Sequence, residues 1–343
     1  MNIPTQADSQ TRRTAPIVMG NSDYLSVLLR LIGMDLYKVR RRLLSKVLLL
    51  IPILLIGGGF FVTGIVAIHD AGLPATSFTT YSCTQFPHDP ECLDHPPTLA
   101  DKQHAKQQVL DGLALYLNMP GNWNVQEHFL IERLVVVGII LAGTLVGGEY
   151  SLGTVRLMFT RGPTRLQFLF AKIAVMAICL VPTLLFIFLM ESGVGAVMAH
   201  LAGVGAGFSF LTADAFAHFV LFALVGMLFW FSFMLMALFF ATVGRSTVAG
   251  IVGPLVWLLI EPVLTGFLSS APGFVQYIPN FLLENNLLSL IHSQMGALGI
   301  LGNDPLVQSG TFSAGQPLLV VAVYLIAFVG VACWLTVRRD VTH

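Results

Sequence analysis

Charged side chains are scarce in this sequence. Only 10% of its 343 residues are Asp, Glu, Lys or Arg, whereas 55% are hydrophobic. Soluble domains carry about 25% charged residues, so this deficit excludes an ordinary soluble protein and indicates an integral membrane protein. The 18 basic residues balance the 18 acidic ones, and the net charge therefore points to no nucleic acid or acidic partner.

The sequence also lacks the common motifs of nucleotide binding and catalysis. It has no G-x-x-x-x-G-K-[ST] loop, so it cannot hold nucleotide phosphates in the usual way. Its nine histidines form neither an H-E-x-x-H motif nor a close cluster, which gives no indication of a metal site. A G-x-S-x-G nucleophile motif and internal repeats are missing as well. We therefore expect a protein that is not itself an enzyme.

Cysteine is rare, with four residues in the chain. Cys179 and Cys333 fall in apolar runs, whereas Cys83 and Cys92 share a long polar segment that is expected to lie outside the cytosol. Because disulfides persist in oxidising compartments, we expect these two to form a bridge. Two unpaired thiols are the alternative.

Long apolar runs are abundant, and they define the expected fold. A helix needs about 20 apolar residues to cross a hydrocarbon core of roughly 30 Å. The expected class is an all-α polytopic membrane protein, with a disordered tail over 1–22, a single membrane domain over 23–343 and an outer loop over 69–128. Six runs meet the length requirement, at 47–68, 129–148, 168–190, 215–243, 248–268 and 317–337.

The basic residues are distributed unevenly between the connecting segments. If the N-terminus lies in the cytosol, only Lys102, Lys106 and Arg133 of the 18 basic residues fall on the outer side. An excess of Lys and Arg in short cytoplasmic loops sets membrane orientation. We therefore expect both termini to be cytoplasmic and the protein to lie in the cell membrane.

The segment before the first run has the pattern of an amphipathic helix. From Asp23 onward, apolar residues recur at helical spacing up to Leu43, and Arg30, Lys38 and Arg41 fall mostly off that stripe. We expect an elbow helix on the inner leaflet, with its cations at anionic headgroups. Ordinary packing against cytoplasmic protein is the alternative.

Residues 147–173 interrupt the apolar pattern with two glycines and several charges. We expect the second span to end at the hinge residues Gly147 and Gly148, because glycine weakens helices and permits sharp turns. A short helix is then expected to begin at Glu149, since a carboxylate is favourable at a helix N-terminus.

The end of this short helix is also indicated by the sequence. Gly162 and Pro163 should stop it, and Thr164 should cap the third span. The simpler alternative is an inner loop whose Arg161 and Lys172 only enforce topology.

The connection between the fifth and sixth runs is unusually apolar. It is broken by Pro279 and by the run Glu284, Asn285 and Asn286, so neither half is long enough to span the membrane. Such segments are typical of re-entrant or interfacial helices.

The stretch "GEYSLGTVRLMFTRGPTRLQFLFAKI" resembles the coupling-helix region of permease subunits in the type-two ABC transporter family, with its pattern E-Y-x-x-G-T-x-R-x-x-x-x-R-G. The elbow "RLIGMDLYKVRRRLLSK" and "GRSTVAGIVGPLVWLLIEPVL" at the fifth span are similar to the same family. The resemblance covers most of the chain from about residue 24, but not the first outer loop.

The resemblance implies a dimeric export permease that couples to a separate cytoplasmic ATPase, with two ATPase copies per complex. ATP and Mg²⁺ would be bound by that partner, and the second permease would be another copy or a related chain. The residues that match the coupling region are Glu149, Tyr150, Gly153, Thr154, Arg156, Leu157 and Arg161.

Three polar residues inside the apolar runs are further candidates. Glu261 lies in the outer third of the fifth span, where it belongs to the substrate path or an outer gate. The alternative is a carboxylate that reaches the interface or pairs within the bundle. Glu191 is expected to be solvated at the outer interface, and His218 to be a hydrogen-bonded packing residue. The aromatic and methionine side chains of the fourth span suit a hydrophobic cargo, but lipid contact or dimer packing explains them at least as well.

Two other functions are compatible with the sequence. One is a membrane anchor or sensor that recruits a cytoplasmic protein without transport, and the other is an ion-driven transporter. Ion-driven carriers commonly have repeated halves with broken helices or charges at the midplane, and the sequence shows no repeat.

Overall fold

The structure is a computed structural model that describes residues 21–78, 98–117, 131–132, 134–159, 163–204, 212–297 and 315–338. Every regular element in these residues is a helix. The elements are α1 (Asn21–Arg41), α2 (Leu43–Gly72), η1 (Ala75–Ser77), α5 (Leu99–Leu117), α7 (Val135–Ser151), α8 (Thr154–Phe159), α9 (Arg165–Leu201), α10 (Ala213–Gly244), α11 (Thr247–Ser269), η3 (Gly273–Phe281), α12 (Leu283–Ala297) and α14 (Gly315–Arg338). The all-α class predicted from the sequence is confirmed for this part of the chain.

Within the described ranges, five helices are long and apolar enough to cross a membrane: α2, α9, α10, α11 and α14. Each coincides with a run predicted from the sequence. The run predicted at 129–148 is different, because α7 begins only at Val135 and has 17 residues. It is apolar but shorter than the other five.

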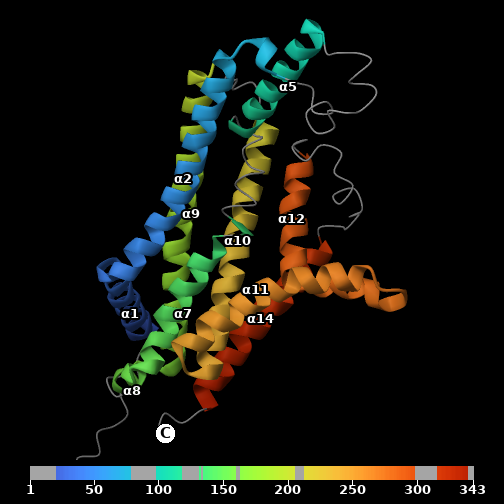
Figure 1. The fold of residues 1–343 in the computed structure, drawn as a ribbon. Coiled ribbons are helices and arrows are strands. Elements are labelled where there is room, and N and C mark those ends of the chain that lie inside the picture. Colours follow the sequence, from blue (N-terminus) through green and yellow to red (C-terminus); the bar gives the residue numbers. More distant parts are fainter. Residues whose placement is uncertain are drawn as a thin grey trace, which may run out of the picture.

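Helix α10 is the centre of the bundle and contacts α7, α9, α11, α12 and α14 (Figure 1). The large side chains that the sequence places on this helix are buried: Phe229 and Phe233 are fully inaccessible, and Trp230, Met234 and Met236 nearly so. They pack inside the chain's own helix bundle, a role that differs from the cargo, lipid and dimer contacts considered for them.

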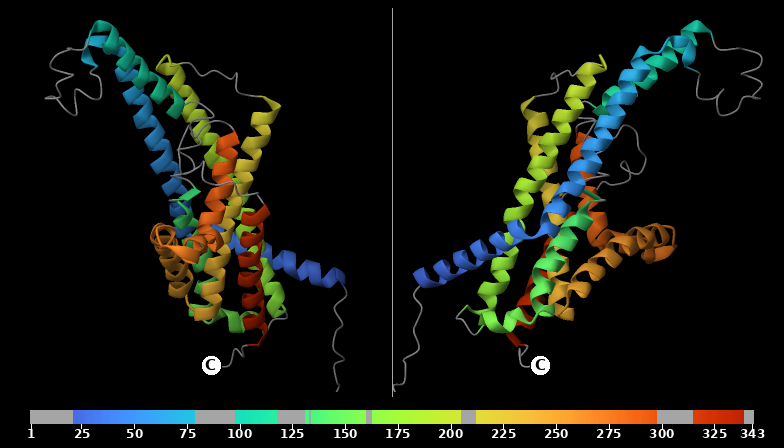
Figure 2. Two further views of the ribbon diagram at one scale, coloured as in Figure 1. Left: turned by 90° about the vertical axis from the view of Figure 1, so that its right-hand side faces the viewer. Right: turned by 60° about the vertical axis from the view of Figure 1, so that its left-hand side comes forward.

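Helix α1 lies across the bundle at a steep angle to α2 (Figure 2). The chain leaves helical geometry at Arg42, whose backbone is extended, and α2 begins at the next residue. Ile32, Leu36 and Val39 of the predicted stripe pack against the core, whereas Leu25 and Leu29 are exposed. A helix is therefore present where the elbow was predicted, and part of its stripe is partly buried against the protein.

Glycines allow α7 and α11 to approach closely. A Cβ on Gly147 would lie 2.6 Å from Thr247 Cα, and one on Gly143 would lie 3.0 Å from the backbone of Gly250. Small residues at four-residue spacing commonly line such contacts between membrane helices. Hydrogen bonds between Ser151 and Thr247 fasten the ends of the two helices at 3.1 and 3.2 Å.

The tight turn predicted between the fourth and fifth spans is confirmed. Helix α10 ends at Gly244, Arg245 adopts a positive φ of 48°, and the Ser246 side chain caps α11 by accepting from the Ala249 N–H.

On the opposite end of the bundle, α5 packs on α2 and η1 (Figure 1). Lys106 of α5 donates to the carbonyls of Ala71 and Leu73 at 3.0 and 2.7 Å, and a cation there complements the helix C-terminus. The predicted bridge between Cys83 and Cys92 lies outside the described residues. So do residues 1–20 of the tail predicted over 1–22, whereas residues 21 and 22 belong to α1.

The predicted break in the fifth connection is confirmed, with η3 and α12 as its two halves. The amide of Asn285 donates to the Pro279 carbonyl at 3.0 Å, and that of Asn286 to the carbonyls of Asn280 and Leu282. These side chains satisfy carbonyl groups where the helix changes direction. Helix α12 then packs between α10 and α14.

Candidate functional site

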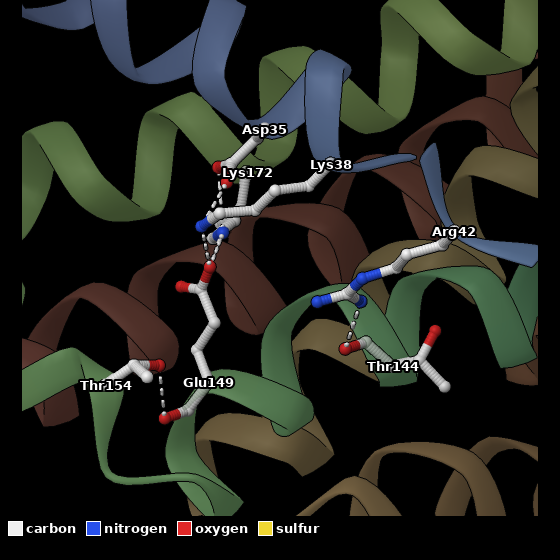
Figure 3. Close-up of polar contacts among 7 residues, drawn as sticks. All are labelled: Asp35, Lys38, Arg42, Thr144, Glu149, Thr154 and Lys172. Carbon is white, nitrogen blue, oxygen red and sulfur yellow. Dashed lines mark hydrogen bonds and ion pairs between the residues drawn. The ribbon is translucent and has the colours of Figure 1, made fainter. Parts of the chain in front are cut away.

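Four charged side chains from three helices meet at the cytosol-facing end expected for α7 (Figure 3). Glu149 comes from the last turn of α7, Lys172 from α9, and Asp35 and Lys38 from α1. These residues are called the charge cluster below. Two carboxylates and two ammonium groups give it no net charge.

Lys172 is the centre of the charge cluster. Its Nζ lies 2.8 Å from Asp35 Oδ2 and 2.8 Å from Glu149 Oε1, and its side chain is fully inaccessible to solvent. The ammonium group also lies 5.1 Å from the centre of the Phe168 ring, within the range of a cation–π contact. Buried charges of this kind are tolerated only when they are paired.

Lys38 completes the cluster from its solvent side, with one third of its side chain exposed. Its Nζ donates to Glu149 Oε1 at 2.9 Å and to Asp35 Oδ1 at 3.3 Å. Partial burial lowers the pKa of Lys38, but the hydrogen bonds and attraction from Glu149 and Asp35 outweigh it and raise the pKa above 10.5. Lys38 therefore stays charged at neutral pH.

Neighbouring contacts extend the cluster along α7. Arg42, at the α1–α2 junction, donates to the Thr144 carbonyl at 3.4 Å, and the Thr154 hydroxyl donates to the Glu149 carbonyl at 3.2 Å (Figure 3). A cavity of about 270 Å³ lies beside the cluster and is lined by Met34, Lys38, Arg42, Glu149, Leu152, Thr154 and Met158. Glu149 Oε2 has no hydrogen-bond partner among the described residues.

Two predictions about this segment are wrong. Helix α7 does not end at Gly147 and Gly148 but continues to Ser151, because Gly147 is needed for close packing on Thr247 rather than for a bend. Glu149 is consequently not at the start of the short helix. It lies in the last turn of α7, where its carboxylate is held by lysines instead of by helix N–H groups.

The direction of the chain changes after Glu149 at Leu152 and Gly153. Gly153 has a φ of 67°, a conformation in which any other residue except Asn or Asp is strained. Helix α8 follows immediately and has six residues. Leu152, at the corner, is 76% exposed.

The remaining residues of the predicted coupling region are distributed around this corner. Tyr150 packs against the core. Arg156 and Leu157 belong to α8, and their side chains are not described; Arg161 lies outside the described residues. Thr164 forms the predicted cap of α9, as a capping box in which its hydroxyl accepts from the Gln167 N–H and its own N–H donates to the Gln167 side chain.

Glu261 is far from the charge cluster and connects α11 to α12. Its side chain accepts from the indole N–H of Trp257 and from the backbone N–H of Asn285 at 3.1 Å. Asn285 is in the first turn of α12, where N–H groups lack partners within the helix. Only 2% of the residue is exposed, and both contacts lie within the bundle; a place on the translocation path stays a prediction.

The predictions for the other two polar candidates, His218 and Glu191, have different outcomes. His218 is hydrogen-bonded as predicted, with its Nδ1 3.0 Å from Gln294 Oε1 on α12. The prediction that Glu191 is solvated is wrong, because only 1% of it is exposed. Neither of its carboxyl oxygens has a partner among the described residues.

Sequence reasoning missed Asp35 and underrated Lys172. Asp35 stands on the polar side of a basic helix, and Lys172 was assigned at most a role in topology. A signal was present, however, because an ionisable residue eight positions into an apolar helix is costly without a partner. That cost predicts that Lys172 has a carboxylate partner near the end of a neighbouring helix.

The described part of the chain is all-helical. Several of its helices are long and apolar enough to cross a membrane. The chain belongs to the family described as "Protein of unknown function (DUF2705)", whose model matches residues 113–342. No curated protein matches the chain. The matched residues include Glu149 and Lys172 but not α1, which supplies Asp35 and Lys38.

Proposed function

We propose that this protein is the transmembrane subunit of an ATP-driven ABC transporter of the type-two permease class, acting in export, and that α8 couples it to a separate ATPase subunit. The observation that carries this proposal is the corner at Leu152 and Gly153, called the joint below, which connects the charge cluster to α8. A short helix projects from the bundle at a corner whose preceding turn is fixed by charged contacts to two other helices.

The joint connects α8 to most of the bundle. The chain turns from α7 into α8 within two residues and enters α9 at Arg165. Glu149 binds α7 to α1 and α9, and Ser151 binds α7 to α11. A force on α8 is therefore applied to four helices together, as a rigid-body change between inward-open and outward-open states requires.

The contacts also give physical roles to residues of the coupling pattern. Glycine is favoured at Gly153 by its positive φ. The hydroxyl of Thr154 donates to the Glu149 carbonyl, one of the four orphan carbonyl groups at the end of a helix. Glu149 itself acts inside the protein, and Leu152 and α8 supply the surface for the partner.

The proposed function implies a specific arrangement of the helices in the membrane. Six helices cross the cell membrane, with α7 as the short second one, and both termini are cytoplasmic. Helix α1 is the elbow at the inner leaflet, and η3 and α12 are re-entrant helices of the outer side. Two copies of this chain, or this chain and a related permease, bind two ATPase subunits, which hold ATP and Mg²⁺.

A pull-down of the tagged full-length protein from detergent tests the proposal. The wild type is compared with Leu152→Asp and Arg156→Glu, which change the corner and α8 but replace no member of the charge cluster. Lys102→Glu on α5, at the opposite end of the molecule (Figure 1), is the matched control. Co-purified proteins are identified by mass spectrometry, and their ATP hydrolysis is assayed.

We expect a stoichiometric ATPase with the wild type and the control, and little or none with the two variants. If the wild type retains no nucleotide-binding subunit, the permease function is wrong and the anchor or ion-driven functions become preferable. If the ATPase binds all variants equally, α8 is not its docking site.

A further inference from the structure

A second cavity, separate from the charge cluster, lies between the α1–α2 junction and the bundle. Its volume is about 620 Å³, within the range of roughly 300–1,000 Å³ for pockets that hold drug-sized ligands. Residues from α1, α2, α7, α9 and α10 line it.

The inner wall of the cavity is apolar. Trp230 and Met234 of α10 are almost completely buried there, and Leu141 of α7 and Leu180 of α9 belong to the same wall. The hydroxyl of Thr183 donates to the Cys179 carbonyl at 2.7 Å, so this polar group is satisfied within α9. Nothing in this wall requires a polar ligand.

Irregular chain geometry borders the cavity on two sides. Pro182 stands inside α9, where it lacks an N–H and its ring disturbs the carbonyl one turn earlier, that of Ile178. On the other side, the helical path is interrupted at Arg42, which separates the start of α2 from the end of α1. Both irregular segments contribute to the lining.

Charge is confined to the side formed by the α1–α2 junction. Arg40 and Lys46 line the cavity there, and both are exposed. Neither forms an ion pair with any residue that the structure describes. By contrast, Lys38 of α1 forms an ion pair with Glu149. Two cations that form no ion pair with the described residues thus stand at the rim of an apolar cavity beside an amphipathic helix.

We infer that this cavity binds an anionic phospholipid, with an acyl chain against Trp230 and Met234 and the headgroup at Arg40 and Lys46. The apolar wall disfavours a small polar anion as the ligand. The two cations at the rim, Arg40 and Lys46, favour an anionic over a zwitterionic headgroup. The inference is independent of the ATPase proposed above, since it requires only that α1 lies at a membrane surface.

Native mass spectrometry of the full-length protein tests the inference. The protein is equilibrated in micelles that contain equal amounts of phosphatidylglycerol and phosphatidylcholine with the same chains, and the retained lipid is counted. The rim variant is Arg40→Gln with Lys46→Gln. The matched control, Arg30→Gln with Arg41→Gln, removes two cations of α1 that do not line the cavity.

We expect one phosphatidylglycerol per wild-type chain and a loss of affinity of about fivefold for each rim cation removed. The control should retain its lipid. Equal retention of the two lipids by the wild type, or an equal loss in the control, would overturn the selective headgroup site.

The acyl part is tested separately by Cys179→Trp, which fills the cavity, with Leu185→Trp on the exposed face of α9 as its control. Thermal unfolding checks that both remain folded. Cys179→Trp should abolish retention while the rim stays intact, and a lipid with a photoreactive acyl chain should label 178–183 or 230–234 in the wild type. Labelling elsewhere, or displacement by glycerol phosphate, which has no chain, would contradict the inference.

Discussion

The carboxylate of Glu149 and the ammonium of Lys172 lie 2.8 Å apart, in a cluster that α1 closes with one further charge of each sign. Removing one member of a buried ion pair leaves an uncompensated charge and costs about 3–5 kcal/mol. We therefore expect Lys172→Met to lower the free energy of unfolding by this amount, which thermal unfolding in detergent would measure.

The double variant Lys172→Met with Glu149→Gln restores neutrality, since Asp35 and Lys38 remain paired at 3.3 Å. It should be more stable than Lys172→Met alone, which is a non-additive result for residues in contact. Arg30→Met, an exposed substitution on α1, is the control and should change stability by less than about 0.5 kcal/mol. Additive effects of the two substitutions would contradict a shared cluster.

Lys38 gives the cluster a defined pH dependence. Its pKa is raised above 10.5 in the folded protein because the attraction of Glu149 and Asp35 exceeds the effect of burial. A raised pKa in the folded state means that the stabilisation is complete below the unfolded value and is lost as the pH rises through the folded value. The difference in melting temperature between wild type and Lys38→Met should stay constant from neutral pH to about pH 10 and shrink above it. A difference that already shrinks between pH 7 and pH 9 would assign the contact to another titrating group.

Gly147 and Gly148 are neighbours with opposite surroundings. A Cβ on Gly147 would lie 2.6 Å from Thr247 Cα, whereas one on Gly148 would have nothing within 4 Å. Gly147→Ala should destabilise the protein by about 1–3 kcal/mol through overpacking. Gly148→Ala should stabilise it by about 0.5–1 kcal/mol, because alanine is the better helix residue.

The same pair tests the predicted hinge. If α7 stays helical through Gly148 during function, Gly148→Ala should leave the ATPase activity of the purified complex unchanged. Loss of activity in a variant with normal or raised thermal stability would instead show that Gly148 must leave the helix in another state.

Glu261 is expected to hold the first turn of α12. Glu261→Ala removes the acceptor of the Asn285 N–H, and loss of such a cap costs about 0.5–2 kcal/mol. Hydrogen exchange should become faster over 283–286 while the exchange of α10 is unaffected. Glu261→Gln retains an oxygen acceptor and should have a smaller effect; an equal effect would mean that the charge itself is required.

These results show which features the sequence could predict. Local signals were sufficient for the apolar helices, for the turn at Gly244 and for the Thr164 cap, because each depends on residues within a few positions. The charge cluster could not be assembled in this way, since Lys38 and Glu149 are separated by 111 residues. The pairing depends on how α1 crosses α7 and α9, which no local pattern records.

The glycine pair illustrates a second limit. Glycine at position 147 is compatible with a helix break and with close helix packing, because both depend on the absence of a side chain. Only the position of Thr247 on α11 distinguishes them. Similarly, the burial of Glu191 depends on residues distant in the sequence, so it could not be predicted from the place of Glu191 near the end of a span.

Glu191 provides the last test, because it is buried without a partner among the described residues. A buried polar group that makes no hydrogen bond costs about 1–3 kcal/mol. Glu191→Met, which is similar in length and apolar, should therefore raise the melting temperature, and Glu191→Gln should not, because its amide is equally unsatisfied. If Glu191→Met is instead less stable than wild type, the carboxyl group has a stabilising partner in the membrane-embedded protein. If stability rises but transport is lost, the unfavourable carboxyl group is retained for function, as stored strain at functional sites often is.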